Sequence, residues 1–446
     1  MKTFESLGLS QNLVSALKEN EFFNPTEIQE RAIPILLKNQ DLVGLSQTGT
    51  GKTLAFALPL IQKTIPQKFV QSLIICPTRE LAEQILLEFK KLSKNIEGVR
   101  AVAIFGGADM QRQIYNLKRG ANIVIGTPGR IIDHIKRKTL KLGLVNSVVL
   151  DEADEMLNMG FRADIEEILK TTPHERQTIM FSATMSKDIL QITKNFMNSP
   201  QTLQVGIPNS TIANIKQTYF ICPKDKKKRA LHALLSQLPQ GRTIIFCNTK
   251  KMVDSVQLYL KKQGFQALAL HGDMPQSVRK KVMNEYKSEL NNLLITTDVS
   301  ARGIDVKDVI QVINFDLPQN NEYYIHRVGR TGRAGKNGNA YTLLNTPEQI
   351  EDLKEIEKKT NSKITLSNLS LTGISTPAPQ KSTKKVGKKL NIKSREKRAI
   401  IAGRTSYTNG KSNKNINVTG NKKLGKKHKT IRRTHKSTKN APKIHF

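Results

Sequence analysis

The chain has no tryptophan, only three cysteines, and few acidic residues for its number of basic ones. Cys76, Cys222 and Cys247 lack the spacing of metal ligands or of a disulfide framework, so we expect small buried hydrophobes in a reducing compartment. No apolar run approaches the roughly 18 residues that span a bilayer, and the first residues lack the apolar region of a signal peptide. The composition therefore argues against a disulfide-rich secreted domain and a helical membrane protein, and it favours a cytoplasmic location.

The charge of the chain is strongly one-sided. Its 72 Lys and Arg residues exceed 37 Asp and Glu residues, which gives a net charge of +35. Such an excess is typical of proteins that bind nucleic acid or an anionic membrane. Residues 381–446 alone hold 22 basic residues and one acid, and they contain few large apolar side chains. We therefore predict a disordered basic tail, which either attracts nucleic acid, the favoured interpretation, or only keeps the chain soluble.

The 446 residues suggest two domains and an appendage. Short apolar runs alternate with longer helical patterns, which predicts an α/β fold with parallel sheets covered by helices on both faces. The segment 205–211 has turn residues and no periodicity, so we expect an interdomain linker there. The expected domains are 1–207 and 212–362, followed by the low-complexity tail 363–446. The expected strands are residues 73–76, 102–105, 123–125, 148–150, 179–181, 243–247, 267–270, 293–296 and 309–314.

Residues 46–53 read SQTGTGKT, the pattern of a phosphate-binding loop. Its two glycines let the backbone turn N–H groups toward phosphate oxygens, because they lack a Cβ atom. The lysine of such a loop reaches the β- and γ-phosphates, and the threonine hydroxyl ligates Mg²⁺. A glycine-rich turn that merely precedes a helix is the alternative. The residues expected to contact the nucleotide are Ser46, which replaces the usual glycine, and Gln47, Thr48, Gly49, Thr50, Gly51, Lys52 and Thr53.

A pair of acidic residues, Asp151 and Glu152, follows the expected strand at 148–150. Ligands of open parallel sheets bind beyond the carboxyl ends of the strands. At that place Asp151 can hold Mg²⁺, usually through water, while Glu152 orients and deprotonates the attacking water. By itself the pair could be a solvated acidic turn, but the upstream loop favours catalysis. The second half has no Gly-Lys-Thr loop, so we predict one ATP site on which a second domain closes.

Further short motifs follow one another along the chain. They are FFNPTEIQ at 22–29, the phosphate loop, PTREL at 77–81, GG at 106–107, TPGR at 127–130, DEAD at 151–154, SAT at 182–184, HGDMPQSVR at 271–279, TDVSARGID at 297–305 and HRVGRTGR at 326–333. This ordered set resembles the DEAD-box ATP-dependent RNA helicases of helicase superfamily 2, over roughly residues 1–360. Two positions depart from the family pattern: Glu21 stands where glycine is common, and Glu27 stands where proline is common. Either change could alter the local turn.

The resemblance implies two tandem RecA-like domains and a set of nucleotide contacts. In the family, the glutamine matching Gln29 reads adenine, because its carboxamide offers one donor and one acceptor. The aromatic residue matching Phe22 stacks on the base, and Asp305 matches a ribose contact. Arg330 and Arg333 match arginine fingers, whose guanidinium groups suit the charge of a phosphoryl transition state. The implied catalytic set is Lys52, Asp151, Glu152, Arg330 and Arg333, with Mg²⁺ at Thr53 and Asp151.

The resemblance also implies contacts to the RNA backbone and residues that couple them to hydrolysis. Glycine pairs and helix N-termini approach phosphates closely, which suits a grip without sequence preference. The implied coupling residues are Asp154, Ser182, Thr184 and His326. The implied RNA contacts are Arg79, Gly106, Gly107, Thr127 and Arg130 in the first domain, and Gln276, Arg279 and Thr297 in the second.

The leading hypothesis is an RNA-stimulated ATPase that unwinds or remodels short RNA duplexes locally. An ATP-gated RNA clamp with little strand separation shares every motif and stays open. A DNA helicase is disfavoured by the glutamine motif and by DEAD at 151–154, and a P-loop transporter subunit by the absence of apolar spans. Few aromatic residues argue against base reading by stacking. We expect a monomer whose tail tethers RNA, with ribosomal or RNA-decay proteins as possible partners.

Overall fold

The computed structural model describes residues 3–46, 49–205, 214–288, 290–301, 306, 308–318, 321–332, 336–360 and 362–368. All of them belong to one compact unit, Met1–Pro379. The expected linker beyond Val205 and the predicted tail beyond residue 368 lie outside the described residues. We call residues 3–205 the first lobe and residues 214–368 the second lobe, and each contains one sheet.

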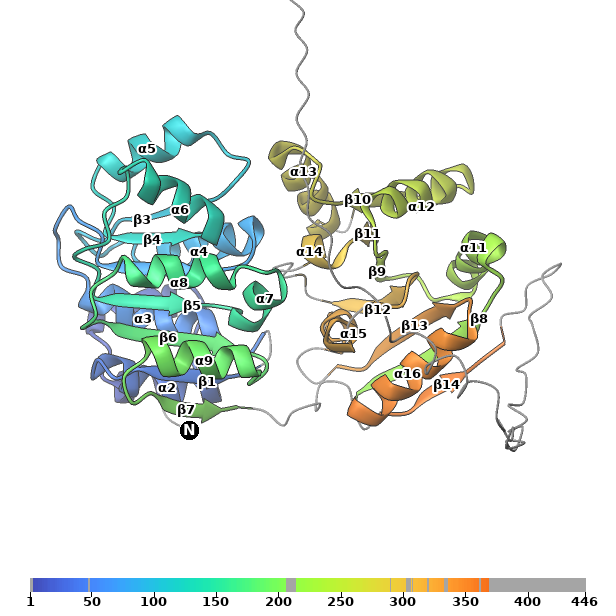
Figure 1. Ribbon diagram of the computed structural model, residues 1–446, viewed down its shortest axis with the longest axis horizontal. Helices are drawn as coiled ribbons and strands as arrows, with labels where there is room; N and C mark the ends of the chain where they lie inside the picture. Colours follow the sequence, from blue (N-terminus) through green and yellow to red (C-terminus); the bar gives the residue numbers. More distant parts are fainter. Residues whose placement is uncertain are drawn as a thin grey trace, which may run out of the picture. The chain divides into compact units, whose positions relative to one another are not determined.

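The first lobe is built on a seven-stranded sheet in the order β3-β4-β2-β5-β6-β1-β7, with every pairing parallel (Figure 1). Parallel strands need crossover connections, and helices supply them here. The strands are β1 Leu42–Leu45, β2 Ser72–Ile75, β3 Ala101–Ile104, β4 Ile123–Gly126, β5 Ser147–Leu150, β6 Gln177–Ser182 and β7 Gln201–Gln204.

Helices cover both faces of this sheet, and two separate cores show which helix lies on which face. The first core receives side chains from α1 Gln11–Glu19, α2 Glu27–Leu37, α3 Lys52–Lys63 and α4 Arg79–Leu92. The second core receives them from α6 Pro128–Lys136, α7 Ala153–Asn158, α8 Arg162–Lys170 and α9 Lys187–Phe196. A short 3₁₀ helix, Glu5–Leu7, precedes α1, and α5 Met110–Lys118 follows β3.

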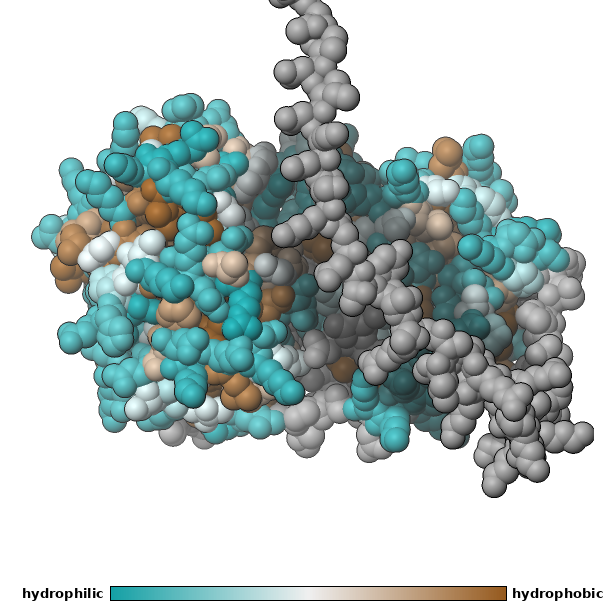
Figure 2. All heavy atoms as spheres, viewed as in Figure 1, coloured by the Kyte–Doolittle hydropathy of each residue, from teal (hydrophilic) through white to brown (hydrophobic). Residues whose placement is uncertain are grey.

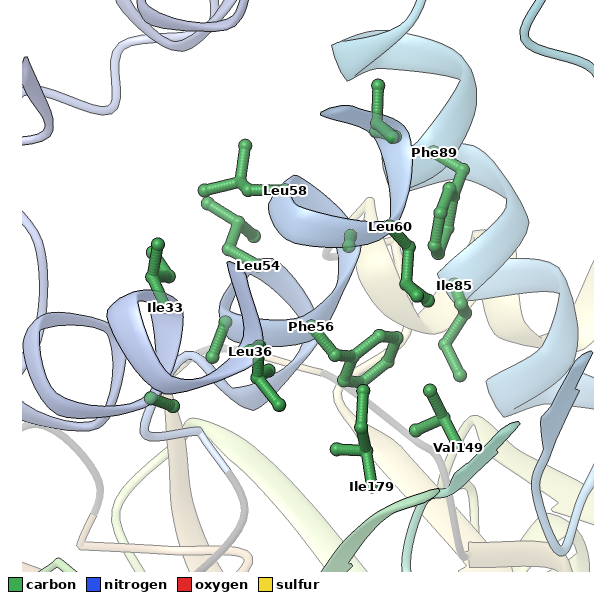
Figure 3. Close-up of a cluster of buried hydrophobic side chains, with 14 of the residues drawn as sticks. Ile33, Leu36, Leu54, Phe56, Leu58, Leu60, Ile85, Phe89, Val149 and Ile179 are labelled. Carbon is green, nitrogen blue, oxygen red and sulfur yellow. The ribbon is translucent and has the colours of Figure 1, made fainter. Parts of the chain in front are cut away.

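Strand residues alternate between the two cores, as the pleat of a strand requires. In β5, Val148 and Leu150 join the second core, and Val149 joins the first. Figure 3 shows the first core, where Phe56 of α3 points toward Val149 and Ile179. The Phe56 ring also lies 5.9 Å, centroid to centroid, from that of Phe181. Because both faces are buried, the central strands read as continuous apolar runs in the sequence.

The second lobe repeats this plan with a seven-stranded parallel sheet in the order β10-β11-β9-β12-β13-β8-β14. Side chains of α11 and α12 pack on one face, and those of α13 to α16 on the other. The elements are β8 Ile215–Ile221, a 3₁₀ helix Lys224–Lys226, α11 Lys227–Gln237, β9 Arg242–Phe246, α12 Lys250–Lys262, β10 Ala267–Leu270, α13 Gln276–Lys287, β11 Leu293–Thr296, α14 Asp298–Ala301, β12 Val309–Asn314, α15 Asn321–Val328, β13 Gly338–Leu344, α16 Pro347–Thr360 and β14 Ile364–Leu366.

The α/β prediction with two parallel sheets is confirmed, and each expected strand overlaps an observed one. The domain limit placed at 362 is too early for the sheet, because β14 pairs with β8 beyond it. Hydrophilic residues cover most of the coloured surface in the view of Figure 2. Among the helices of the described residues, none has the length and apolar character needed to cross a bilayer.

Candidate nucleotide and RNA site

The phosphate-binding loop joins β1 to α3. Gly49 and Gly51 have φ angles of 86° and 95°, in the left-handed region where a Cβ atom is strained. Gly51 caps the N-terminus of α3, so the helix begins at Lys52 with its first N–H groups directed toward the loop. This geometry suits a bound phosphate, because a helix N-terminus carries partial positive charge.

Lys52 and Ser46 are both buried and lie together. The Lys52 Nζ atom donates a hydrogen bond of 3.1 Å to the Ser46 carbonyl oxygen. The Ser46 N–H donates to the Ser182 carbonyl, and the Thr50 hydroxyl lies 3.4 Å from the Ser46 hydroxyl. Ser46, which replaces the usual glycine, therefore makes a polar contact within the loop, and its side chain is small.

The acidic pair stands at the carboxyl end of β5, next to this loop. Asp151 and Glu152 are 3% and 8% exposed. Burial raises the pKa of Asp151, and the positive charge of Lys52 opposes that rise. Burial and the neighbouring charge of Asp151 raise the pKa of Glu152 to about 7, although Lys52 and Arg330 oppose the rise. A carboxyl with a pKa near neutral pH suits a general base.

Asp154 ties the acidic motif to the Ser-Ala-Thr segment. Its Oδ2 atom accepts hydrogen bonds from the N–H groups of Ala183 and Thr184, each at 3.0 Å, and from the Thr184 hydroxyl at 3.3 Å. The Ser182 hydroxyl donates to the Thr184 carbonyl oxygen at 2.7 Å. A carboxylate accepts several bonds at once, so one side chain couples two segments that are distant in the sequence.

The donor set at the acidic pair fits Mg²⁺ bound together with phosphates. No group of three or more His, Cys, Asp and Glu side chains in the described ranges could hold a metal ion. Mg²⁺ is usually held by one or two carboxylates, substrate phosphates and waters, not by an all-protein cage. A single buried carboxylate, Asp151, and the hydroxyl of Thr53 at the start of α3 match that requirement.

Gln29 connects the upstream motif to the phosphate loop. It occupies the third position of α2 and forms a capping box with Thr26, whose N–H donates to the Gln29 Oε1 atom at 3.0 Å. The Gln29 Nε2 atom donates to the Gly51 carbonyl oxygen, also at 3.0 Å. Phe22 is half-buried against the first core. Gln29 is 3% exposed, and adenine recognition by its carboxamide stays a prediction.

Three of the expected RNA contacts in the first lobe meet in space. A Cβ atom added at Gly107 would overlap an Arg79 guanidinium nitrogen, and one at Gly106 would lie 3.6 Å from the other. Gly107 also has a φ angle of 79°. The two glycines therefore leave the space that the Arg79 guanidinium occupies, and a side chain at position 107 would displace it.

Arg79 has other arginines close by. Burial lowers the pKa of Arg79, and the positive charges of Arg279 and Arg130 add to that effect, while Glu80 opposes it. The Arg130 Nη1 atom donates to the Ala108 carbonyl at 3.2 Å, which holds its side chain near the glycine pair. Thr127 precedes α6 and its side chain makes no capping hydrogen bond. Clustered cations are unfavourable by themselves, and a bound phosphate would relieve their repulsion.

The residues of the second lobe that are expected to contact RNA differ in how far other protein groups engage their side chains. Arg279 is 5% exposed, and its Nε atom donates to Glu80 at 2.7 Å while Nη1 donates to the His271 carbonyl at 2.9 Å. Its guanidinium is thus largely engaged by protein groups. In contrast, the Gln276 Oε1 atom is buried without a hydrogen-bond partner in the described structure. Thr297 is nearly buried and directly precedes α14.

His326, at the end of α15, pairs with Glu155 through its Nδ1 atom. Burial alone would lower the pKa of His326, but the hydrogen bond and charge of Glu155 outweigh it and raise that pKa. Arg330 follows one helical turn later and is 8% exposed. Its charge acts on Glu152, which places a cation of the second lobe near the predicted base. Of the remaining predicted site residues, Gln47, Thr48, Asp305 and Arg333 lie outside the described residues.

Sequence reasoning assigned no role to Arg327, although it lies inside the motif that contains His326 and Arg330. Arg327 is 1% exposed, and its Nε and Nη2 atoms donate to the two carboxylate oxygens of Asp298 at 2.5 and 2.7 Å. Nη2 also donates to the Asn248 side chain at 2.8 Å, and Nη1 to the Asp316 carbonyl at 2.5 Å. Only the residue type could have indicated this role in the sequence. The planar guanidinium of an arginine presents its N–H donors in a fixed geometry that suits bidentate pairing with a carboxylate.

Two family models match the chain: that of the DEAD/DEAH box helicases over residues 26–192, and that of the helicase conserved C-terminal domain over residues 226–335. The DEAD-box ATP-dependent RNA helicase CshA of Geobacillus kaustophilus (strain HTA426) is 46% identical over 365 residues, covering 82% of this chain and 78% of that protein. The protein of the same name from Bacillus subtilis (strain 168) is 44% identical over 363 residues, covering 81% and 73%.

Solved structures give the same result for the fold. S. cerevisiae Dbp5 bound to RNA and ADP BeF3 aligns with a TM-score of 0.76 and 32% identity, covering 83% of this chain and 96% of that chain. Mss116p bound to ssRNA and AMP-PNP aligns with a TM-score of 0.74 and 29% identity, covering 82% and 80%. Both alignments extend over the two lobes.

Proposed function

Because this chain belongs to the DEAD-box ATP-dependent RNA helicase family, we propose that it separates short RNA duplexes, with Glu152 as the general base of ATP hydrolysis. The observation that carries this proposal is the buried acidic pair beside Lys52, with Asp154 bonded to the Ser-Ala-Thr segment. These contacts join the hydrolytic carboxylates to the segment for which the family resemblance implies coupling to RNA.

Each residue has a distinct task in the proposed hydrolysis. Lys52 binds the β- and γ-phosphates, and the backbone of the loop orients them. Glu152 takes a proton from the attacking water through its carboxylate. Arg330 stabilises the negative charge that develops on the transferred phosphoryl group. Mg²⁺, held by Asp151 and Thr53, would neutralise phosphate charge. Arg327 positions the end of α15 and therefore Arg330, through its bonds to Asp298 and Asn248.

The RNA side of the site is proposed to grip phosphates and not bases. Arg79 and Arg130 lie together beside a glycine pair that gives close access to the backbone. Such contacts set register without reading sequence. Binding of ATP and RNA then favours contact between Glu152 of the first lobe and Arg330 of the second, which makes hydrolysis depend on RNA.

A strand-displacement experiment tests this function against a clamp. A fluorescent RNA duplex with a short paired region is mixed with protein and ATP, and both strand release and phosphate release are followed. The parent should release strands and hydrolyse ATP faster with RNA, whereas Lys52→Ala should do neither. RNA-stimulated hydrolysis without any strand release would show a clamp. Hydrolysis by Glu152→Gln at the parental rate would show that another group is the base.

A further inference from the structure

A groove of about 350 Å³ lies along the free edge of the first sheet. Strand β3 is one of the two edge strands of this sheet, and β7 is the other (Figure 1). Ala101 and Ala103 of β3 line the groove, together with Lys90 of α4 and with Lys94, which follows that helix.

Two residues of β3, Ala101 and Ala103, have backbone N–H and C=O groups without a hydrogen-bond partner among the described residues. The Arg100 carbonyl accepts from Ile123 N–H, and the Ile104 carbonyl accepts from Thr127 N–H, each at 3.2 Å. Residues of a parallel strand alternate in the side to which their N–H and C=O groups point. Ala101 and Ala103 therefore direct these groups away from β4, toward the groove. An edge strand of this kind is a template for another strand.

The groove also carries a charge that no acidic lining residue balances. Lys90, Lys94 and Arg100 line it, and no Asp or Glu does. Both lysines are exposed, and neither makes an ion pair among the described side chains. Arg100 donates one hydrogen bond to the Arg119 carbonyl, which fixes its position beside the strand.

This groove is separate from the nucleotide and RNA site. Its strand residues run from Val99, before β3, to Ala103, and stop short of the last residue of the strand. The predicted RNA contacts Gly106, Gly107 and Thr127 follow the C-terminal ends of β3 and β4. The amino ends and the carboxyl ends of parallel strands lie on opposite sides of the sheet. A ligand can therefore occupy the groove while the nucleotide and RNA site is active.

We propose that the groove binds an extended acidic segment of a protein partner, which adds as a strand beside β3. Backbone pairing with Ala101 and Ala103 supplies affinity, and carboxylates of the segment meet Lys90, Lys94 and Arg100. RNA fits less well, because its backbone lacks the N–H and C=O groups that a strand presents in the right spacing to pair with Ala101 and Ala103. The chain's own segment 381–446 is excluded by its net charge of +21.

The test uses a fluorescein-labelled octapeptide of alternating glutamate and valine, with the lysine–valine octapeptide and octauridylate as comparison probes. Anisotropy is measured with the full chain and with a Lys90→Glu/Lys94→Glu variant. The matched control is Lys91→Glu/Lys141→Glu, which changes the charge equally outside the groove. Only the acidic peptide should bind strongly, and the groove variant should weaken it by about tenfold, against less than about twofold for the control.

A second variant tests the strand pairing itself. Ala103→Pro removes an N–H group that faces the groove and costs no bond to β4, so the fold should survive while peptide affinity falls. Bound peptide should also slow amide exchange at Ala101 and Ala103. Equal effects of the groove and control variants, or unchanged exchange, would overturn the proposal. A groove variant that loses octauridylate and not the acidic peptide would show an RNA site instead.

Discussion

Glu152 and Asp154 are two residues apart, yet their carboxyl groups have opposite surroundings. Asp154 accepts hydrogen bonds from the N–H groups of Ala183 and Thr184, which hold its carboxylate in place. Glu152 is buried beside a second carboxyl group, Asp151, and its pKa rises to about 7. Asp154 thus connects two segments of the chain, whereas the Glu152 carboxyl has the pKa that suits a general base.

This difference makes the stability effect of Glu152→Gln depend on pH. The Glu152 carboxyl has a pKa of about 7 in the folded state, against an ordinary value of 4.5 for a glutamate in water. It therefore stabilises the fold fully below pH 4.5, and that contribution is lost as the pH rises through 7. Glutamine does not ionise, so the variant should gain about 3 kcal/mol over the parent at pH 8 and much less at pH 5. Calorimetric unfolding at both pH values measures this gain, with the exposed Glu175→Gln as control. The same gain at both pH values would contradict the raised pKa.

Gln29 allows a second test on a single side chain. Gln29→Ala should weaken the preference for ATP over GTP, because the adenine edge would lose its paired hydrogen bonds, at a cost on the order of 1–3 kcal/mol. Gln29→Glu keeps the acceptor for the Thr26 N–H but cannot donate to the Gly51 carbonyl. The ratio of kcat/KM for the two nucleotides is the measurement. A parent enzyme that uses both nucleotides equally would remove the basis for this interpretation.

Among the elements, the turn after α1 shows the physical meaning of a departure from the family pattern. Glu21 has a φ angle of 62°, and the Phe22 N–H donates to the Leu17 carbonyl while the Glu21 N–H donates to the Lys18 carbonyl. These two bonds form a Schellman motif, in which the left-handed residue is usually glycine. Glutamate at this position is therefore strained.

Replacing Glu21 by glycine should stabilise the chain by about 1 kcal/mol, because glycine adopts the left-handed conformation without a Cβ clash. The control is Glu19→Gly in α1, where glycine should cost about 1 kcal/mol of helix stability. The unfolding temperatures of the parent and both variants test whether the backbone at Glu21 is strained. If Glu21→Gly lowers the unfolding temperature as Glu19→Gly does, the strain is absent.

The sequence predicted nine of the strands, the edge strands β3 and β10 among them, and it missed β1, β7, β8, β13 and β14. Strands β2, β5 and β11 are buried on both faces, so they stand out as apolar runs. Edge strand β7 exposes most of its residues, and β14 has three residues, so neither gives an apolar signal. Strand β1 was missed because it is short and contains Gly44, where an added Cβ would overlap the Phe181 ring.

Site prediction followed a similar division. Motif spacing correctly placed Lys52, Asp151 and Glu152 on the loop and at the strand end, and their catalytic roles stay predictions. Partners across the sequence could not be found that way. The Glu80–Arg279 ion pair joins residues 199 positions apart, and the Asn248–Arg327 bond spans 79 positions. Such contacts depend on the tertiary arrangement, and a single sequence carries no signal of which side chains meet.

At the scale of the whole molecule, side chains of the two lobes meet in ion pairs. Arg279 and Lys280 pair with Glu80 and Glu83 of α4. His326 pairs with Glu155 in the same way.

The chain also carries its charge unevenly, with +21 of its +35 in residues 381–446. The catalytic motifs all lie before residue 334, so charge and catalysis are separable by truncation.

Deleting residues 381–446 should weaken RNA binding and flatten its dependence on salt. Each phosphate contact to single-stranded RNA contributes a slope of roughly −0.7 in log affinity against log salt concentration. RNA affinity of the full and truncated chains is measured at several salt concentrations, with ATP turnover at saturating RNA as the control that should survive. Parallel salt curves of equal strength would show that the tail serves solubility or a protein partner.

The packing of Arg79 over Gly106 and Gly107 has a consequence for evolution. A Cβ atom at position 107 would overlap the arginine, and the backbone there has a φ angle of 79°. Position 107 cannot drift alone, because a lineage that gains a side chain there must shorten the residue at 79 and adopt a different loop. Wherever arginine at 79 and this turn are inherited, glycine at 107 should therefore be inherited with them.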